Sequence, residues 1–384
     1  MAARVEHRPV RPRAAARPRV TQSRSRNAGL LIGLVAVLNV IGLVMVLSAS
    51  SVHALRAYGS AWIFFQRQLI WVALGAIVLL ATMRLDYRIW RRLVVPLLGL
   101  TVVLLALVLV PGLGISVGGS SRWLGVGFLR VQPSEIAKLA VAVFAADVLT
   151  RRVDYMNQTR MTVLPVLLVF SVIALLIVVQ PDLGTTLVLS CIVIAVLFIA
   201  GVPLPTMTGI LALGGAGVFM AGMTKGYRRG RLLCFLHPAS DPGNTCYQLR
   251  QSLVGLGTGH VTGVGLGASR AKWGYLPNAH TDFIFAIIGE EVGLIGSLLV
   301  VGLFVAFAVL GVRVALRAPD RFGTLLAAGI TAWVVGQAFI NIGAAIGTLP
   351  ITGVPLPFVS FGGSSLVIAM AATGILVNIA KQGR

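Results

Sequence analysis

Asp282 is the residue of this sequence best placed to do chemistry at a membrane. It ends a polar stretch, residues 224–282, and a long apolar run starts directly after it. A carboxylate at that boundary could do chemistry on a membrane-borne substrate. The structural alternative is a first helical turn, in which Thr281 caps the helix and the acid only favours the helix dipole. The residues alone leave both interpretations open.

Two further polar motifs share one design, in which Gln and Pro precede an acid at the start of an apolar helix. They are Gln132-Pro133-Ser134-Glu135 and Gln180-Pro181-Asp182. Proline suits the first helical turn, and an acid there meets the positive end of the helix dipole. Asp182 is therefore expected to be a helix cap or a site residue. Glu135 and Lys138 share one helix face, where they could form a structural ion pair or hold a proton or an anionic group.

Two glutamates, Glu290 and Glu291, follow Asp282 by about 12–13 Å along the predicted helix at a rise of 1.5 Å per residue. The apolar run 283–312 is longer than a bilayer core requires. We therefore expect its first turns to project from the membrane or to line a cleft. Gly289 and Gly293 form a small-xxx-small pair and are expected to pack against a neighbouring helix.

The polar stretch is rich in glycine between residues 255 and 267, yet it does not match a nucleotide-binding loop. It lacks the Gly-Lys-Ser/Thr ending and the Gly-x-Gly-x-x-Gly spacing. Its cations suit an anionic headgroup or a pyrophosphate, or are simply solvated; they include Arg228, Arg229, Arg231, Arg270 and Lys272. The sequence also lacks zinc-hydrolase, Gly-x-Ser-x-Gly and Asp-x-Asp motifs. Any sugar transfer would thus need a donor other than a metal-bound nucleotide sugar.

The elements that carry these residues are membrane helices. Hydrophobic residues make up 57% of the 384 positions, charged residues 11%, and the mean hydropathy is +0.93, which excludes an ordinary soluble domain. We expect an all-α polytopic membrane protein with about ten transmembrane helices, because each helix must cross about 30 Å of hydrocarbon. The apolar runs fall at 29–50, 62–83, 93–110, 131–149, 162–179, 183–200, 204–223, 283–312, 323–346 and 364–380.

The connections between these runs place both termini in the cytoplasm. With the N-terminus inside, the inner segments hold 20 of the 32 Lys and Arg residues, as the positive-inside rule requires. Residues 224–282 then form a large extracytoplasmic loop between helices 7 and 8, and the polar motifs collect on the outer side. Residues 1–28 are expected to be a disordered basic tail that can touch anionic lipid. With no folded basic module, nucleic acid is not an expected partner, and no cleavable signal peptide is evident.

The three cysteines divide between the membrane and the outer loop. Cys191 lies inside a predicted span and is expected to be a small core residue. Cys234 and Cys246 lie in the outer loop, where an oxidising compartment permits a disulfide. The sequence does not decide whether they form one.

The polar motifs occur in a fixed order along the chain. They are Ser121-Arg122-Trp123-Leu124, the run from Gln132 to Lys138, the run from Gln180 to Thr185, Tyr247-Gln248, the run from Leu276 to Phe285, and the run from Thr352 to Ser365. Over residues 29–382 the chain resembles the SEDS family of cell-wall glycosyltransferases. Gly289-Glu290-Glu291 and residues 264–270 are more similar to its FtsW branch than to its RodA branch. Cys246 departs from the family pattern, which usually has a small residue there.

This resemblance implies polymerisation of lipid II, in which the 4-hydroxyl of one disaccharide attacks the anomeric carbon of another and undecaprenyl pyrophosphate leaves. The catalytic acid of the family maps onto Asp282, as the general base. Arg122, Lys138 and Lys272 are expected to neutralise the pyrophosphate, with Glu135 orienting Lys138. A divalent cation, Mg²⁺ or Mn²⁺, could share that work. Further expected substrate contacts are Trp123, Gln180, Asp182, Gln248, His280, Ser360 and Ser364.

The resemblance also implies partners and a location. A class B penicillin-binding protein, the septal transpeptidase, and other divisome membrane proteins are the expected partners, at the division septum of the bacterial plasma membrane. A RodA-type elongation polymerase is the nearest alternative. A lipid II flippase is a second, and it predicts polar residues through the full depth of the membrane. A third is a non-catalytic division scaffold that recruits proteins through residues 1–28.

Overall fold

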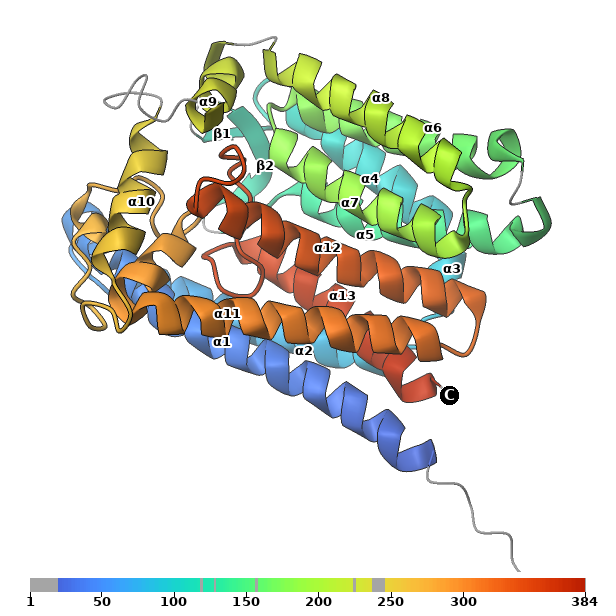
Figure 1. The fold of residues 1–384 in the computed structure, drawn as a ribbon, viewed down its shortest axis with the longest axis horizontal. Helices are drawn as coiled ribbons and strands as arrows, with labels where there is room; N and C mark the ends of the chain where they lie inside the picture. The colour runs from blue at the N-terminus through green and yellow to red at the C-terminus, as the bar shows by residue number, and fades with distance from the viewer. Residues whose placement is uncertain are drawn as a thin grey trace, which may run out of the picture.

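The computed structural model of this chain describes residues 20–117, 120–127, 129–155, 158–223, 226–236 and 246–383. Long helices run along one another, and a small sheet lies toward the end where α9 and α10 lie (Figure 1). The helices are α1 Val20–Tyr58, α2 Ile63–Arg84, α3 Ile89–Arg92, α4 Val94–Leu109, α5 Pro133–Arg151, α6 Thr159–Val179, α7 Leu183–Ala200, α8 Leu204–Met223, α9 Gly226–Leu236, α10 Tyr247–Thr258, α11 Ile284–Arg317, α12 Arg321–Ala345 and α13 Gly363–Gln382.

Each apolar run predicted from the sequence overlaps one helix of the structure, namely α1, α2, α4 to α8 or α11 to α13. Within the described residues, 8 helices are long and apolar enough to cross a membrane. The other two are α4, which has 16 residues, and α5, which carries Glu135, Lys138 and Asp147. The protein is thus a largely helical membrane protein, while the number of spans and the side of each terminus stay predictions.

The first helix begins earlier than expected. We predicted a disordered tail over residues 1–28, but α1 already starts at Val20. The last proline before the apolar run is Pro18, so nothing after it prevents the helix from extending backwards from its apolar part. The rest of the predicted tail, residues 1–19, lies outside the described residues.

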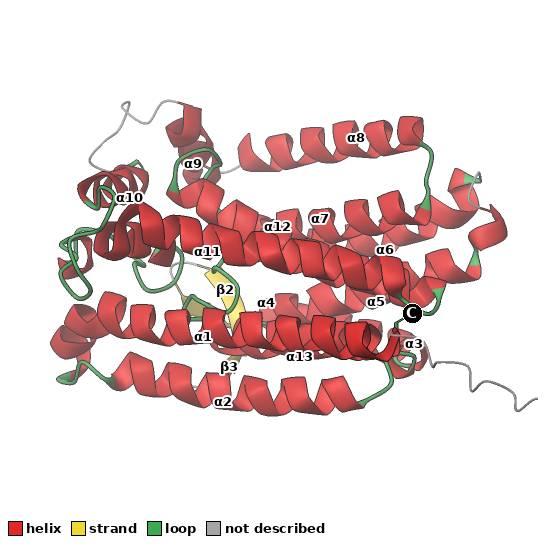
Figure 2. Cartoon of the chain, turned by 60° about the horizontal axis from the view of Figure 1, so that its bottom comes forward, coloured by secondary structure: helices red, strands yellow, loops and turns green. Residues whose placement is uncertain are grey.

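Two C-terminal helices form the centre of the bundle and α8 forms its edge. α12 packs against α7 and α11, and α13 packs along α2. Small residues allow this closeness: a side chain on Gly311 of α11 would collide with Thr331 of α12. By contrast, α8 buries only Met207 and Gly222, and it lies at the border of the molecule in both views (Figure 1, Figure 2). One face of the bundle is therefore loosely covered.

A three-stranded antiparallel sheet fills the connection between α4 and α5, which the sequence analysis had left without structure. Its strands are β1 Ile115–Val117, β2 Ser120–Val126 and β3 Leu129–Val131, in that spatial order. The turn before β3 contains Gly127, whose φ of 64° favours glycine. The sheet presents Arg122 and Trp123 of β2 toward the bundle, where both line a cavity described below.

α11 contains a break that corrects the expected role of its glycines. At Gly293 the backbone leaves the helix, with φ 72° and ψ −163°. The loop after α10 fills the break: Leu294 and Ile295 donate their N–H groups to the carbonyls of His260 and Val261, at 3.0 and 3.2 Å. Gly293 thus admits a loop backbone, whereas the sequence had predicted a neighbouring helix. No Cβ fits at this position because Gly263 N would lie 2.4 Å from it.

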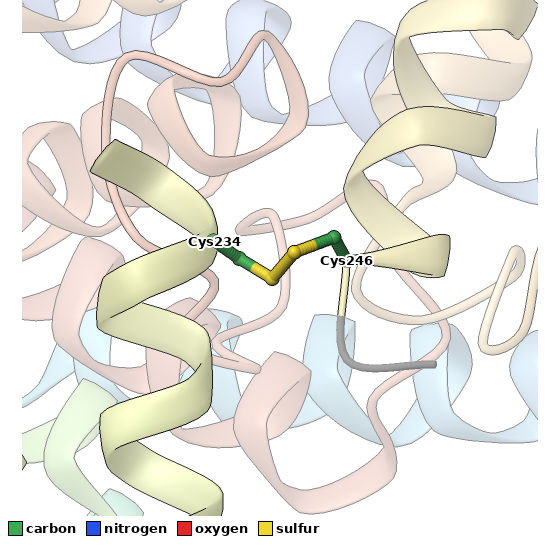
Figure 3. The surroundings of a disulfide bond; sticks show 2 residues. All are labelled: Cys234 and Cys246. Carbon is green, nitrogen blue, oxygen red and sulfur yellow. A yellow bond between two sulfur atoms is a disulfide. The ribbon is translucent and has the colours of Figure 1, made fainter. Parts of the chain in front are cut away.

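The two cysteines of the outer loop form a disulfide, the question that the sequence left open. Cys234 on α9 is bonded to Cys246 at the start of α10 (Figure 3). The bond joins two helices whose connecting residues, 237–245, are not described. Cys191 is half-buried on α7 and is not part of a disulfide.

Candidate active site

Asp282 lies two residues before α11 and lines a polar cavity of about 310 Å³. Its backbone is held from two sides: its N–H donates to Asn278 O at 3.1 Å, and its carbonyl accepts from Asn341 Nδ2 of α12 at 2.8 Å. The helix-cap alternative is wrong. Phe283 occupies the N-cap position without a side-chain cap, and the Thr281 hydroxyl donates to Asn278 O instead.

The C-terminal polar motif passes beside the Asp282 carboxylate. A Cβ placed on Gly353 would lie 3.5 Å from Asp282 Oδ2, and Gly353 has a φ of 74°. The positive φ favours glycine here, and the short distance shows that the backbone of Gly353 lies next to the carboxylate. Ser360 ties the two loops together, because its hydroxyl donates to Thr281 O at 2.6 Å and accepts from Leu356 N at 2.9 Å. The serine predicted to bind substrate therefore braces the loop that carries Asp282.

The surroundings of Asp282 raise the pKa of its carboxyl. Burial raises the pKa of its carboxyl from 3.8 to about 6, against the opposing effect of the positive charges on Arg231 and Arg122. Asp182 adds a smaller upward effect on the same pKa. A carboxyl with a pKa of about 6 is ionised at neutral pH and still takes up a proton more readily than an ordinary aspartate.

Arg122 and Asp182 form one wall of the polar cavity. Arg122 donates to the carbonyls of Gln180, at 3.1 Å, and of Pro181, and its Nη1 lies 3.9 Å from Asp182 Oδ1. Asp182 caps α7 by accepting from Thr185 N at 3.1 Å. The two interpretations of Asp182 are thus compatible, since the carboxylate is a cap and also lines the cavity.

Glu135 and Lys138 form the ion pair that their spacing predicted. Lys138 Nζ lies 2.6 Å from Glu135 Oε2 and donates to Gln337 Oε1 at 2.8 Å. The ammonium also lies 5.0 Å from the ring centre of Trp333, a cation–π distance. Glu135 lines the polar cavity, whereas Lys138 is fully buried behind it. Lys138 can therefore act on a ligand only through Glu135.

Several residues predicted to contact substrate lie around the cavity rather than in its lining. Gln180 donates to Leu105 O at 2.9 Å, and the Ser364 hydroxyl accepts from Gln132 N at 3.1 Å. His280 packs on Phe64 with ring centres 4.9 Å apart, and burial lowers its pKa to about 4. Gln248 is half-buried on α10. These side chains support the walls, and Trp123 alone among the predicted aromatic and amide contacts lines the cavity.

Lys272 belongs to a different cluster. Its ammonium lies 3.3 Å from Glu291 Oε1 and also donates to Ser48 Oγ at 3.2 Å. Glu290 accepts from the Arg270 and Ala271 N–H groups at 2.8 and 3.3 Å. The two glutamates, expected to project or to line a cleft, are buried and anchor this loop. Since Lys272 does not line the polar cavity, the structure gives no support to its predicted role at a pyrophosphate.

Of two further residues of the site, Arg231 was named only as one of the loop cations that suit an anionic group, and Asn341 was not predicted. Arg231 lines the cavity from α9, but in the sequence it is one of several arginines with no distinguishing mark. Asn341 was hidden in an apolar span, and a buried amide in such a span is a detectable signal. For the possible divalent cation, the described residues hold no group of three His, Cys, Asp or Glu side chains placed to bind a metal.

An apolar groove adjoins the polar cavity. Its first part, of about 230 Å³, is lined by Leu183, Val218 and Phe219 among others. Its second part, of about 380 Å³, lies among α6, α7, α8 and α12 and is lined almost entirely by apolar side chains. The linings of the two parts have in common Leu187, Gly215, Val218, Pro350 and Thr352. The groove therefore runs beneath the loosely packed α8 and ends at the polar cavity.

Comparison with known proteins agrees with this architecture. Residues 28–384 match a family model described as "Cell cycle protein", which covers FtsW, RodA and SpoVE. The chain belongs to this family. A relative from Mycobacterium tuberculosis, named probable peptidoglycan glycosyltransferase FtsW, is 42% identical over 353 residues, covering 92% of this chain and 67% of the relative. Stage V sporulation protein E of Bacillus subtilis is 40% identical over 356 residues, covering 92% and 97%.

A solved structure shows that family members share this fold. One solved structure describes the structural coordination of polymerization and crosslinking by a peptidoglycan synthase complex. One of its chains superposes on this protein with a TM-score of 0.73. It is 29% identical, and the match covers 91% of this chain and 96% of that one. The resemblance to the SEDS family and its FtsW branch, stated from the motifs, is confirmed by these matches.

Proposed function

We propose that this chain is a peptidoglycan glycosyltransferase that polymerises lipid II into glycan strands at the outer face of the plasma membrane. One observation carries the proposal: a polar cavity lined by the half-buried Asp282 adjoins an apolar groove, and the two spaces share lining residues. A lipid-linked disaccharide has the same two parts, a polar sugar and an apolar tail. The cavity and the groove can hold both at once, with the reacting atoms beside Asp282.

In the proposed reaction Asp282 is the general base. It takes the proton of the acceptor 4-hydroxyl while that oxygen forms a bond to the anomeric carbon of the donor. The bond from this carbon to the pyrophosphate oxygen breaks, and its electron pair leaves with undecaprenyl pyrophosphate. The raised pKa of Asp282 suits this proton transfer, and Arg122 places positive charge on the same cavity.

The relatives support the reaction and suggest its setting. The M. tuberculosis relative carries the name of a peptidoglycan glycosyltransferase, and the synthase complex joins polymerization to crosslinking. For this chain we propose a class B penicillin-binding protein and other divisome proteins as partners. We also propose that it acts at the division septum. Both termini are then cytoplasmic, and residues 224–282 lie outside.

The flippase alternative requires polar groups that a headgroup can follow through the whole membrane. Charges do occur at the far end of α5, but they are paired with each other: Asp147 lies 2.7 Å from Arg91 Nε and 2.9 Å from Arg151 Nε. Such closed ion pairs are typical of anchoring at a membrane surface. The observation favours polymerisation.

The test uses purified full-length protein with its transpeptidase partner and labelled lipid II. Glycan products are separated on gels for wild type, Asp282→Asn and a control, Asp154→Asn, whose side chain is exposed outside the cavity. We expect product from wild type and the control only. Glycan made by Asp282→Asn at the wild-type rate would refute the assignment, and lipid II translocation in vesicles by the same variant would favour the flippase.

A further inference from the structure

Arg231 stands where the polar cavity meets the apolar groove. Among the described residues, the two spaces share three in their linings, Arg122, Arg231 and Thr352. Two of the three are arginines, so the junction carries two positive charges. In a lipid-linked sugar the group between the apolar tail and the sugar is the pyrophosphate. The position of the two arginines therefore corresponds to the position of that group.

The two arginines belong to two elements that are far apart in the sequence. Arg122 belongs to β2 and is held by the carbonyls of Gln180 and Pro181. Arg231 belongs to α9 and donates from Nη1 to Ile351 O at 3.3 Å. Arg231 also lies close to the base: a Cβ on Gly353 would be 3.8 Å from Arg231 Nη1 and 3.5 Å from Asp282 Oδ2. A ligand held by both guanidinium groups would thus lie next to Asp282.

The disulfide fixes the helix that carries Arg231. Cys234 follows Arg231 by three residues, so both side chains lie on one face of α9. Its bond to Cys246 links α9 to the start of α10 (Figure 3). α10 is in turn packed on α11 and α12, and its Ser252 hydroxyl donates to Ala345 O at 2.7 Å. Through this bond α9 is attached to the rigid part of the bundle.

We propose that Arg231 and Arg122 together bind the pyrophosphate of the lipid-linked donor, and that the Cys234–Cys246 disulfide positions Arg231 for this contact. The inference rests on the proposed function and adds the residue that receives the leaving group. A guanidinium donates two parallel hydrogen bonds to phosphate oxygens. Two such groups offset the charge that grows on the pyrophosphate as its bond to the anomeric carbon breaks.

The test measures binding, so it does not depend on turnover. Radiolabelled undecaprenyl pyrophosphate is bound to the detergent-solubilised full chain and displaced by undecaprenyl monophosphate, which gives the ratio of the two affinities. Wild type should prefer the pyrophosphate. Arg231→Gln should lose about tenfold or more of this preference, the usual effect of a lost hydrogen bond to a charged group, and Arg231→Lys should retain part of it. Arg229→Gln is the matched control, since Arg229 is exposed on the same helix and lines neither space.

A second measurement keeps Arg231 and removes only its support. In Cys234→Ser/Cys246→Ser the preference for pyrophosphate should fall toward that of Arg231→Gln, while monophosphate affinity stays near wild type. A wild-type ratio in folded Arg231→Gln would overturn the role of Arg231, and a wild-type ratio in the serine pair would overturn the role of the disulfide. Asp282→Asn should make no glycan yet keep the preference, so failure of the proposed reaction is distinguishable from failure of this inference.

Discussion

Two clusters of buried charge lie near the start of α11, and they differ in what their carboxylates contact. In one, Glu291 accepts from the Ser48 hydroxyl at 2.6 Å and pairs with Lys272 at 3.3 Å, while Glu290 accepts from loop N–H groups. In the other, Asp282 faces a cavity, and among the described residues it forms no ion pair. The carboxylates of the first cluster bind to other groups of the protein, whereas the carboxylate of Asp282 faces a cavity.

This difference separates a structural site from the site at which we propose the chemistry occurs. A buried carboxylate that is fully hydrogen-bonded holds two segments together, as Glu290 and Glu291 hold the loop after α10. A carboxylate that is desolvated but not paired keeps a raised pKa, which costs stability and supplies a base. Charge alone would not have told the two clusters apart, because both contain acids beside cations.

The largest effect expected is the loss of polymerisation in Asp282→Asn, by about 10²–10⁴ in rate, the usual worth of a general base. Stability should not fall. The pKa of Asp282 rises from 3.8 to about 6 on folding, so its ionisation favours the unfolded chain as pH rises through that interval. A neutral Asn removes this cost. Thermal unfolding in detergent, beside gel assays of glycan, checks both parts, and a marked drop in melting temperature would place Asp282 with the structural cluster.

Glu291→Gln should show the reverse pattern. It leaves the Lys272 ammonium buried without its carboxylate, and breaking a buried pair in this way usually costs about 3–5 kcal/mol. We expect a lower melting temperature with nearly unchanged polymerisation per folded molecule. Lys272→Met/Glu291→Leu is the control, because removing both charges should recover much of the stability. If Glu291→Gln lost as much polymerisation activity per folded molecule as Asp282→Asn, this cluster would also take part in the chemistry.

Ser360→Ala should have the smallest effect, and it probes the connection between the base and its surroundings. The change removes the hydrogen bonds to Thr281 O and Leu356 N, which are worth about 1 kcal/mol each. We expect a modest loss of stability and a fall in kcat with little change in KM, since the loop that carries Asp282 becomes less constrained. Ser364→Ala is the control variant, because Ser364 lies in the first turn of the neighbouring helix α13. An unchanged kcat in Ser360→Ala would show that the brace does not position the base.

The helices could be predicted from the sequence, because apolar runs of membrane length have one stable conformation in lipid. Local signals also succeeded: the spacing of Glu135 and Lys138 gave their ion pair, and Gln-Pro-Asp gave the cap of α7. What failed depends on contacts between distant segments. Three such contacts are the insertion of a loop at Gly293, the pairing of Lys272 with Glu291 and the position of Arg231 at the cavity. They depend on how the described residues between α8 and α11 pack on the bundle.

The pH dependence of polymerisation tests most directly whether Asp282 is the base. In wild type, kcat/KM should fall about tenfold per pH unit below about 6, where the carboxyl is protonated and cannot accept a proton. Arg231 and Arg122 hold this pKa down and Asp182 raises it, so Arg231→Gln should move the midpoint to higher pH while Arg229→Gln leaves it in place. A kcat/KM that stays flat from pH 7 to pH 5, or a midpoint that Arg231→Gln does not move, would contradict the assignment.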